Sequence, residues 1–277
     1  MPNNTNKTWF ITGTSRGFGR DWTVAALERG DRVAATARDV GRLKDLEEKY
    51  GDRVLAIPLD VTDRRACFAA VDRAHAAFGR LDVIVNNAGY GLFGMIEEIA
   101  EDEARAQLET NVFGALWVTQ AALPHLRAQR SGHILQVSSI GGIVAFPGLG
   151  LYHASKWALE GFSQALAGEV AGSGIHVTLI EPGGYETDWS GSSAVRAKAN
   201  PAYDSVKEQM TERRRSMIGK RGDPKASAKA ILKVVDAPEP PLRIFLGEAP
   251  LQLAKADYAK RLATWEAWDA VSKEAQG

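Results

Sequence analysis

A tyrosine and a lysine four residues apart, Tyr152 and Lys156, are the residues of this sequence best suited to move a proton. The amphipathic run over 154–170 predicts a helix, and residues i and i+4 are neighbours on one helix face. A free tyrosine has a pKa of about 10, so it is a poor base at neutral pH. An ammonium group close by favours the phenolate, so we expect Lys156 to lower the pKa of Tyr152.

Two serines, Ser138 and Ser139, follow the apolar run 133–137, which predicts a buried strand. Ligands of open α/β sheets bind at the carboxyl ends of the strands. A serine hydroxyl there can hold a substrate oxygen while a tyrosine exchanges a proton with it. The three residue types therefore predict acid–base chemistry on a carbonyl or alcohol oxygen. A Tyr-x-x-x-Lys pair also occurs by chance in many helices, so other parts of the chain must show whether this pair is catalytic.

A glycine-rich turn over 12–19 connects a short apolar strand over 8–12 with a helical run over 21–29. This order of strand, glycine turn and helix is what a phosphate-binding loop needs. Glycines let the backbone approach a pyrophosphate, and the start of the helix offers unpaired N–H groups and a positive dipole end. The spacing is G-x-x-x-G-x-G, and the alternative is an ordinary tight turn.

Two arginines, Arg16 and Arg38, indicate which dinucleotide would bind. Many dinucleotide folds carry an acid near the end of the second strand to hold the ribose 2′-hydroxyl. Here the strand over 32–36 is followed by Ala37 and Arg38, and Arg16 lies in the glycine turn. Guanidinium groups suit a 2′-phosphate, which favours NADP(H). The alternative is that Arg38 only begins a solvated loop with Asp39.

Strands and helices alternate along the chain. The predicted fold is α/β, a Rossmann-type doubly wound parallel sheet of about seven strands with helices on both faces. Every residue marked for chemistry except Asn111 is then expected at the carboxyl edge of the sheet. The further strands are expected over 53–58, 81–85, 174–180 and 242–246, and the further helices over 40–50, 63–78, 101–129 and 224–235.

We expect one domain over 1–277 with a flexible N-terminus over 1–6. The polar segment 188–222 breaks the alternation, and the amphipathic segment 249–277 predicts a helical tail that packs against its own body. The alternative is that the tail packs against another subunit.

Composition limits the possible partners. Lys+Arg and Asp+Glu both number 34, so there is no electrostatic case for nucleic acid or an anionic membrane. No run of 18 apolar residues predicts a membrane span. One cysteine, Cys67, and the absence of an apolar signal segment favour a cytoplasmic location. The histidines have no metal-ligand spacing, so no metal site is predicted.

Taken together, the motifs resemble the short-chain dehydrogenase/reductase family. The resemblance covers about 7–190 and a last strand near 242–247. The family resemblance is carried by T-G-x-x-x-G-x-G over 12–19, N-N-A-G over 86–89, Asn111, a serine thirteen residues before Tyr152, Y-x-x-x-K over 152–156 and P-G-x-x-x-T over 182–187. More loosely, the run Ile180-Glu181-Pro182-Gly183-Gly184 resembles the branch that includes hydroxysteroid and retinol dehydrogenases.

The resemblance implies a role for each catalytic residue. Tyr152 would donate the proton in reduction, and Ser139 would hold the carbonyl oxygen. Lys156 would lower the pKa of the tyrosine and bind the nicotinamide ribose. Asn111 would anchor a water in the proton relay, and Thr187 would meet the nicotinamide carboxamide. The basic pair is similar to the NADP-preferring pattern of the family.

The expected binding residues follow from the motifs and the resemblance. Asp60 would accept from the adenine amino group or, alternatively, cap the next helix. The segment after 188 resembles a mobile substrate lid, and its aromatic residues would line an apolar pocket or only pack. The cofactor residues are Gly13, Ser15, Arg16, Gly17, Phe18, Gly19, Arg38, Asp60, Val61, Asn87, Ala88, Gly89, Tyr152, Lys156, Pro182, Gly183, Tyr185 and Thr187, and the pocket residues are Phe146, Leu149, Tyr185 and Trp189.

The expected function is an NADP(H)-dependent oxidoreductase that acts on a hydrophobic ketone or secondary alcohol. One alternative is an NAD-linked dehydrogenase of a steroid- or retinol-like alcohol. Another is a sensor that binds NADPH without turnover. The resemblance also implies a homo-oligomer, either a dimer or a tetramer.

Overall fold

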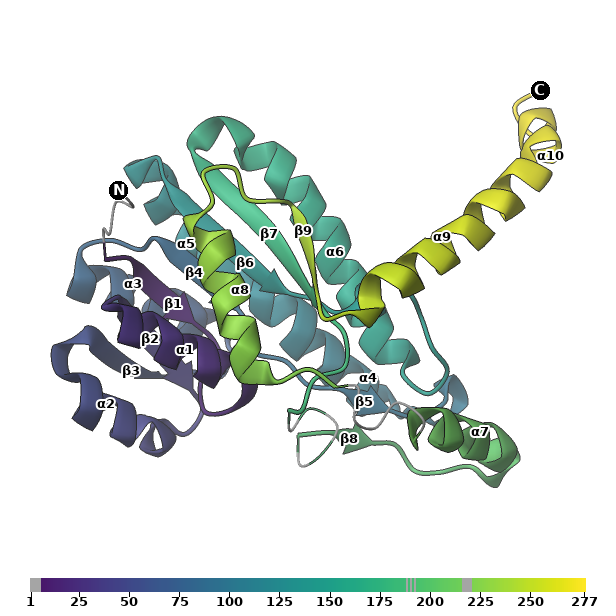
Figure 1. The fold of residues 1–277 in the computed structure, drawn as a ribbon, viewed down its shortest axis with the longest axis horizontal. Coiled ribbons are helices and arrows are strands. Elements are labelled where there is room, and N and C mark those ends of the chain that lie inside the picture. The colour runs from purple at the N-terminus through teal and green to yellow at the C-terminus, as the bar shows by residue number, and fades with distance from the viewer. Residues whose placement is uncertain (1–5, 188, 190, 192, 216–220) are drawn as a thin grey trace.

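A seven-stranded parallel sheet forms the centre of the computed structural model, which describes residues 6–187, 189, 191, 193–215 and 221–277 (Figure 1). Neighbouring strands follow the order β3-β2-β1-β4-β6-β7-β9, and this doubly wound order confirms the predicted fold class. Most of the N-terminus predicted to be flexible lies outside the described residues. The strands are β1 (Thr8–Ile11), β2 (Arg32–Ala37), β3 (Val54–Pro58), β4 (Val83–Asn86), β6 (Gly132–Val137), β7 (Ile175–Pro182) and β9 (Arg243–Leu246).

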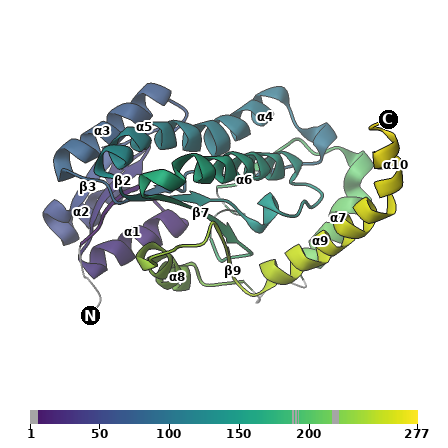
Figure 2. The same ribbon diagram turned by 90° about the horizontal axis from the view of Figure 1, so that it is seen from above.

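Helices cover both faces of the sheet (Figure 2). Side chains alternate along a strand, so Trp9 and Ile11 of β1 pack on one face while Phe10 packs on the other. All three are buried, as expected for a strand in a parallel sheet with two covered faces. One layer contains α1 (Gly17–Arg29), α2 (Lys44–Tyr50) and α8 (Pro224–Asp236), and the other contains α3 (Arg64–Phe78), α5 (Gly114–Gln129) and α6 (Gly150–Val170).

The segment predicted as a lid lies against residues 92–98. Its short strand β8 (Val195–Arg196) pairs with β5 (Leu92–Phe93), and α7 (Asp204–Arg215) follows. Lys207 forms an ion pair with Glu98, and Tyr203 Oη donates to Glu97 at 2.6 Å. Residues 188, 190, 192 and 216–220 of this segment lie outside the described part. The mobility of the lid stays a prediction.

The C-terminal tail forms α9 (Ala249–Ala267) and α10 (Asp269–Glu274). Pro250 and Ala254 are buried at its start, but Trp265 is 59% exposed. Figure 1 shows α9 extending away from the sheet. Arg261 still contacts the body, because it donates to Ile143 O at 3.1 Å and lies over the Trp157 ring at 4.7 Å. The prediction that the tail packs along its own body is therefore wrong only beyond Arg261. Within the described residues, no helix has both the length and the apolar character needed to cross a bilayer.

Candidate active site

Tyr152, Lys156 and Ser139 meet at the carboxyl ends of β6 and β7. The two α6 residues lie one helical turn apart, and each is 6% exposed. Ser139 lies just after β6, and its hydroxyl is close enough to Tyr152 to act to lower the pKa of the phenol. Lys156 Nζ donates to Val137 O at 2.8 Å and lies 5.7 Å from the centroid of the Tyr152 ring. The structure thus brings together the three residues predicted to transfer a proton.

Burial dominates the protonation of the pair. It raises the pKa of Tyr152 to about 12, which the nearby Ser139 hydroxyl only partly offsets. It lowers the pKa of Lys156 to about 8, while the Glu160 carboxylate acts in the opposite direction. The predicted lowering of the Tyr152 pKa is therefore wrong in direction, because loss of water disfavours the phenolate. Tyr152 is a protonated phenol at neutral pH, which suits a proton donor.

Asn111 lies in a π-helical turn, Glu109–Phe113, between α4 (Glu101–Leu108) and α5. Turns of this kind are frequent at functional sites. The Asn111 side chain is 2% exposed; it accepts from Tyr90 N at 3.1 Å and donates to Tyr90 O and Ser155 Oγ at 3.0 Å each. Ser155 Oγ donates to Tyr152 O at 2.6 Å. The network therefore connects Asn111 to the backbone carbonyl of Tyr152 and fixes the first turn of α6.

An Asn111→Ala variant is expected to unfold more easily. The change removes the acceptor of the Tyr90 N–H and two further hydrogen bonds, and an orphaned buried donor costs about 1–3 kcal/mol. Urea denaturation should show this loss in the free energy of unfolding. Thr110→Ala, in the same turn, is the matched control. Equal midpoints for both variants would contradict a structural role for the network.

The turn between β1 and α1 fits a pyrophosphate. Gly13 has a φ of +70°, and a Cβ on Gly19 would lie 2.4 Å from Gly13 O. The helix begins at Gly17, and the preceding Arg16 makes no side-chain cap to its first turn. Backbone N–H groups at such a start attract anions. Ser15 lies in this turn and Phe18 in the first turn of α1, and their cofactor contacts stay a prediction.

The loop after β4 is fixed to this turn. Asn87 Nδ2 donates to Thr12 O at 2.8 Å and to Gly13 O at 3.1 Å. Thr12 Oγ1 accepts from the N–H groups of Asn87 and Ala88, each at 2.9 Å. Asn86 Nδ2 donates to a glutamine of β6 at 3.0 Å. These bonds confirm that the asparagines tie neighbouring strands.

Gly89 lies close to Asn111. A Cβ on this glycine would lie 3.1 Å from Asn111 Oδ1 and 3.8 Å from Lys156 Nζ, so a side chain here would crowd the Asn111 amide. The contact between a ribose and Lys156 stays a prediction.

Arg16 and Arg38 lie on neighbouring elements at the same edge of the sheet. Arg16 immediately precedes α1, and the exposed Arg38 directly follows β2. The two elements are joined, because Thr14 N and Thr14 Oγ1 donate to Thr36 O at 2.9 Å and 3.1 Å. This placement agrees with one phosphate site for both arginines.

Asp60 and Val61 follow β3 at the carboxyl edge. Asp60 Oδ1 accepts from Thr62 N at 3.0 Å and from Thr62 Oγ1 at 2.8 Å. Asp63, and not Asp60, caps α3 through a bond from Ala66 N at 3.0 Å. The alternative that Asp60 caps this helix is therefore wrong. Val61 is buried against the start of α5.

The turn after β7 carries the predicted nicotinamide contacts. Pro182 ends the strand, and Gly183 N donates to Leu246 O at 2.9 Å, which joins the turn to β9. Thr187 Oγ1 accepts from Trp189 N at 3.4 Å. These residues lie where the prediction placed them along the sheet edge.

Two of the predicted pocket residues lie by the proton-transfer site. The ring of Trp189 packs against Tyr152, with centroids 4.9 Å apart, and against Phe93 at 5.1 Å. Leu149 immediately precedes α6 and forms a bridge with Gly94. Trp189 therefore forms an apolar wall beside the Tyr152 ring.

The other two predicted pocket residues pack elsewhere. Tyr185 lies edge-on to Phe18 of the glycine turn, with centroids 5.0 Å apart. Phe146 packs in a cluster with Phe245 and Leu253 at the base of the tail. Neither makes a ring contact with Tyr152 in the described part of the chain.

Two residues that support the site, Gln107 and His153, were not among the site residues predicted from the sequence. Gln107 Oε1 accepts from Leu92 N at 2.8 Å and Gln107 Nε2 donates to Tyr90 O at 3.0 Å. Its spacing of four from Asn111 is the signal that could have revealed it. His153 Nδ1 lies 3.0 Å from Gly141 O, and Gly141 N donates to Ser139 Oγ at 2.9 Å. His153 thus supports the turn that positions Ser139.

Comparison with known proteins agrees with this geometry. A family model for short chain dehydrogenases matches residues 7–197. The Botryotinia fuckeliana protein named oxidoreductase BOA17 is 44% identical over 268 residues, covering 96% of this chain and 98% of that protein. A 3-ketodihydrosphingosine reductase from Bacteroides thetaiotaomicron is 34% identical over 239 residues and 86% of each chain.

Solved structures show the same fold. A short-chain dehydrogenase from Streptomyces avermitilis has a TM-score of 0.90 and 38% identity, with 98% of each chain covered. A Burkholderia cenocepacia enzyme in complex with NADP has 25% identity and a TM-score of 0.75 over 95% of this chain and 98% of that one. A Brucella melitensis 3-ketoacyl-(acyl-carrier-protein) reductase complexed with NADH has 25% identity and a TM-score of 0.74 over 87% and 96%. This chain is therefore an oxidoreductase of the short-chain dehydrogenase/reductase family.

Proposed function

We propose that the protein catalyses hydride transfer between NADP(H) and a hydrophobic ketone or secondary alcohol, with reduction as the favoured direction. The observation that carries this proposal is the buried Tyr152, whose pKa the nearby Ser139 acts to lower and which Lys156 follows one turn later. The apolar wall formed by Trp189 supports a hydrophobic substrate. The similarity to a 3-ketodihydrosphingosine reductase supports a ketone.

Each side chain has one task in reduction. NADPH supplies the hydride when it is bound. The Ser139 hydroxyl donates to the substrate carbonyl oxygen, and the Tyr152 phenol gives its proton to that oxygen. The Lys156 ammonium stabilises the phenolate that remains. We expect Asn111 to anchor a water of the relay through which the phenolate regains a proton.

The residues around the sheet edge support NADP(H) in preference to NAD(H). Within the described residues no ion pair joins Arg38 to a carboxylate, and the neighbouring Asp39 accepts from Gly41 N at 3.0 Å and pairs with Arg42 at 3.8 Å. Asp39 therefore leaves Arg38 available for a phosphate. Related structures hold NADP or NADH, so the NAD-linked alcohol dehydrogenase is the alternative.

Initial rates of NADPH and NADH oxidation across a panel of aromatic and aliphatic ketones test the proposal. We expect NADPH to be oxidised faster with at least one class of ketone. Faster oxidation of NADH would favour the NAD-linked alternative. Tight NADPH binding with no reduction of any ketone, and no oxidation of the matching alcohols, would favour the sensor.

The rate of reduction is expected to fall as the pH rises through about 8. Tyr152, with a pKa of about 12, stays protonated over this range, whereas Lys156, with a pKa of about 8, loses its charge. The neutral amine cannot stabilise the phenolate, so kcat/KM should decline on the alkaline side. A profile that stays flat well above this pH would contradict the role of Lys156.

A Glu160→Gln variant should move this alkaline limb to lower pH. Glu160 lies one turn after Lys156, and its negative charge raises the lysine pKa. Without that charge the ammonium is lost earlier as the pH rises. Glu169→Gln, an exposed change on the same helix, is the matched control and should leave the limb in place.

The proposal includes two properties beyond the reaction. The single cysteine of the sequence supports a cytoplasmic location. Exposed aromatic side chains of the tail, Trp265 and Trp268, support a homo-oligomer that is a dimer or a tetramer.

A further inference from the structure

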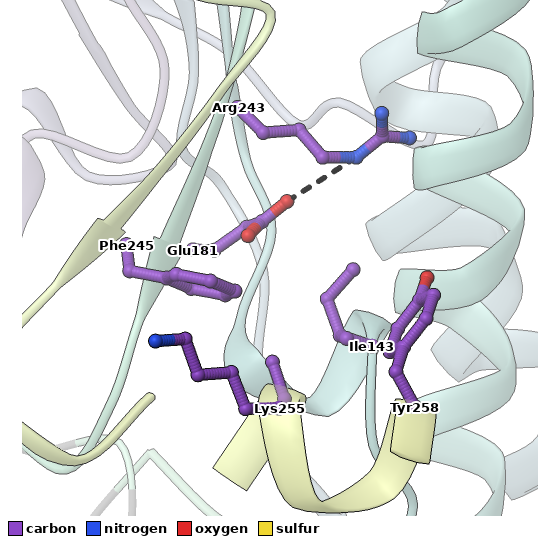
Figure 3. Close-up of a pocket in the computed structure, with 7 residues that line it drawn as sticks. Ile143, Glu181, Arg243, Phe245, Lys255 and Tyr258 are labelled. Atoms are coloured by element: carbon purple, nitrogen blue, oxygen red, sulfur yellow. Dashed lines mark ion pairs between the residues drawn. The ribbon is translucent and has the colours of Figure 1, made fainter. Parts of the chain in front are cut away.

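A cavity of about 300 Å³ lies between β7, β9, the tail helix α9 and the turn after Ser139 (Figure 3). We call it the tail cavity. Its size is at the lower end of the range for small-molecule sites. None of its lining residues belongs to the proton-transfer site or to the cofactor edge. The lining residues are Ile143, Glu181, Arg243, Phe245, Ala254, Lys255 and Tyr258.

Two buried carboxylates share one guanidinium group at the inner end of the tail cavity. Arg243 Nε lies 3.0 Å from Glu160 Oε2 and 3.5 Å from Glu181 Oε1. Glu160 is 6% exposed and Glu181 is fully buried. Glu160 also acts on the charge of Lys156, whose pKa it raises. Glu160 thus faces two cationic side chains, whereas Glu181 has only the longer contact to Arg243. A buried carboxylate with so little compensation is costly away from water, so the inner end of the cavity offers Glu181 to an additional cation.

Glu181 is the group that lacks partners. Neither of its oxygens receives a hydrogen bond from a donor among the described residues, so only a proton shared with Glu160 satisfies them. Burial and the nearby Glu160 raise the pKa of Glu181 to about 8, which means that the pair holds this proton at neutral pH. A cation that enters the cavity would replace the proton.

The walls of the cavity suit an apolar body attached to that cation. Phe245 and Tyr258 present aromatic rings, and Ile143 presents an aliphatic side chain (Figure 3). Aromatic faces attract cations, and an ammonium group offers three donors to a carboxylate. We propose that the tail cavity binds a small organic ammonium ion whose charged group pairs with Glu181 and whose apolar body lies between Ile143, Phe245 and Tyr258.

In the part of the chain that the structure describes, the other charged groups around the cavity do not pair with Glu181, so its carboxylate remains available to a bound ammonium ion. Figure 3 shows the Lys255 side chain rising from α9 toward Phe245; Lys255 is exposed, and no ion pair joins it to Glu181 within the described residues. On α9, Asp257 pairs with Arg261 at 2.5 Å. On α6, Lys156 donates to a backbone carbonyl. An anionic guest would meet an arginine that two carboxylates already neutralise, so a cation is favoured.

The test uses benzylammonium as the probe, with benzyl alcohol and benzoate as neutral and anionic counterparts of the same shape. Titrations of the full chain followed by NMR should give the tightest binding for benzylammonium. Binding of benzylammonium displaces a proton from the pair. Its affinity should therefore increase by up to about tenfold for each unit by which the pH is raised, as long as the pH stays below the pKa of Glu181.

Glu181→Gln should weaken benzylammonium binding at least about tenfold, since it removes the charge that pairs with the guest. Glu169→Gln is the matched control and should bind as the unaltered protein does. Tyr258 is an exposed residue of the cavity wall, and Tyr258→Ala should also weaken benzylammonium binding. This variant replaces Glu181→Gln in the test if Glu181→Gln does not fold.

The proposal is overturned if benzyl alcohol or benzoate binds as tightly as benzylammonium, if none of the three binds, or if Glu181→Gln keeps full affinity. None of these outcomes depends on ketone reduction, so the test is independent of the proposed function.

Discussion

Replacing Tyr152 with phenylalanine is expected to lower the rate of ketone reduction by about a hundredfold to ten-thousandfold, the usual contribution of a positioned acid. Phenylalanine keeps the ring that packs against Trp189 but has no proton to give. NADPH binding should change little, because Lys156 and the glycine turn remain. Initial rates at saturating NADPH and a fluorescence titration of the cofactor measure the two effects separately.

Tyr50→Phe is the matched control for this experiment. Tyr50 is also buried, its hydroxyl has no hydrogen-bond partner within the described residues, and it ends α2 far along the chain from Tyr152. The same chemical change there should leave the rate unaltered. A Tyr152→Phe enzyme with the normal rate would refute the proton-donor role, whereas loss of both turnover and NADPH binding would indicate a damaged fold.

The sheet was predictable because its strands are short apolar runs separated by clear turns. The run 133–137 became β6 and the run 174–180 became β7, with ends shifted by a residue or two. The glycine turn and the serine, tyrosine and lysine motif were predictable for the same reason. Their positions depend on strand ends, and parallel strands bring those ends to one edge.

Properties that depend on three-dimensional packing were not predictable. The pKa of Tyr152 moves upward because the surrounding side chains exclude water, and no spacing rule reports that exclusion. Asn111 reaches the site through a π-helical turn, which a pattern of helical residues does not reveal. The tail is amphipathic, but its sequence does not say whether a surface is available to receive it.

The carboxylate pair beneath the tail illustrates the same limit. Arg243 is 83 residues from Glu160, and they meet only because β9 lies beside β7 and α6 covers that edge. The positions of the predicted pocket residues were not predictable for the same reason. Tyr185 and Trp189 are four residues apart in the sequence, yet Tyr185 packs against Phe18 and Trp189 packs against Tyr152. The path of the loop after β7 decides this separation.

Replacing Arg38 with aspartate is expected to lower kcat/KM for NADPH by about tenfold to a hundredfold and to favour NADH. The change removes a charge-assisted hydrogen bond, worth about 1.5–3 kcal/mol, and places a carboxylate near the phosphate. Aspartate at the end of β2 is also positioned to accept from the ribose hydroxyl of NADH. The ratio of kcat/KM for the two cofactors, measured with one ketone, gives the result.

Arg42→Asp is the control for Arg38→Asp. It makes the same change of charge four residues later, at an exposed arginine that pairs with Asp39. A general electrostatic effect on an anionic cofactor would appear in both variants, whereas direct recognition of the phosphate would appear only in Arg38→Asp. If the preference is unchanged in both, Arg38 does not contact the phosphate, and the NAD-linked dehydrogenase becomes the better account of the site.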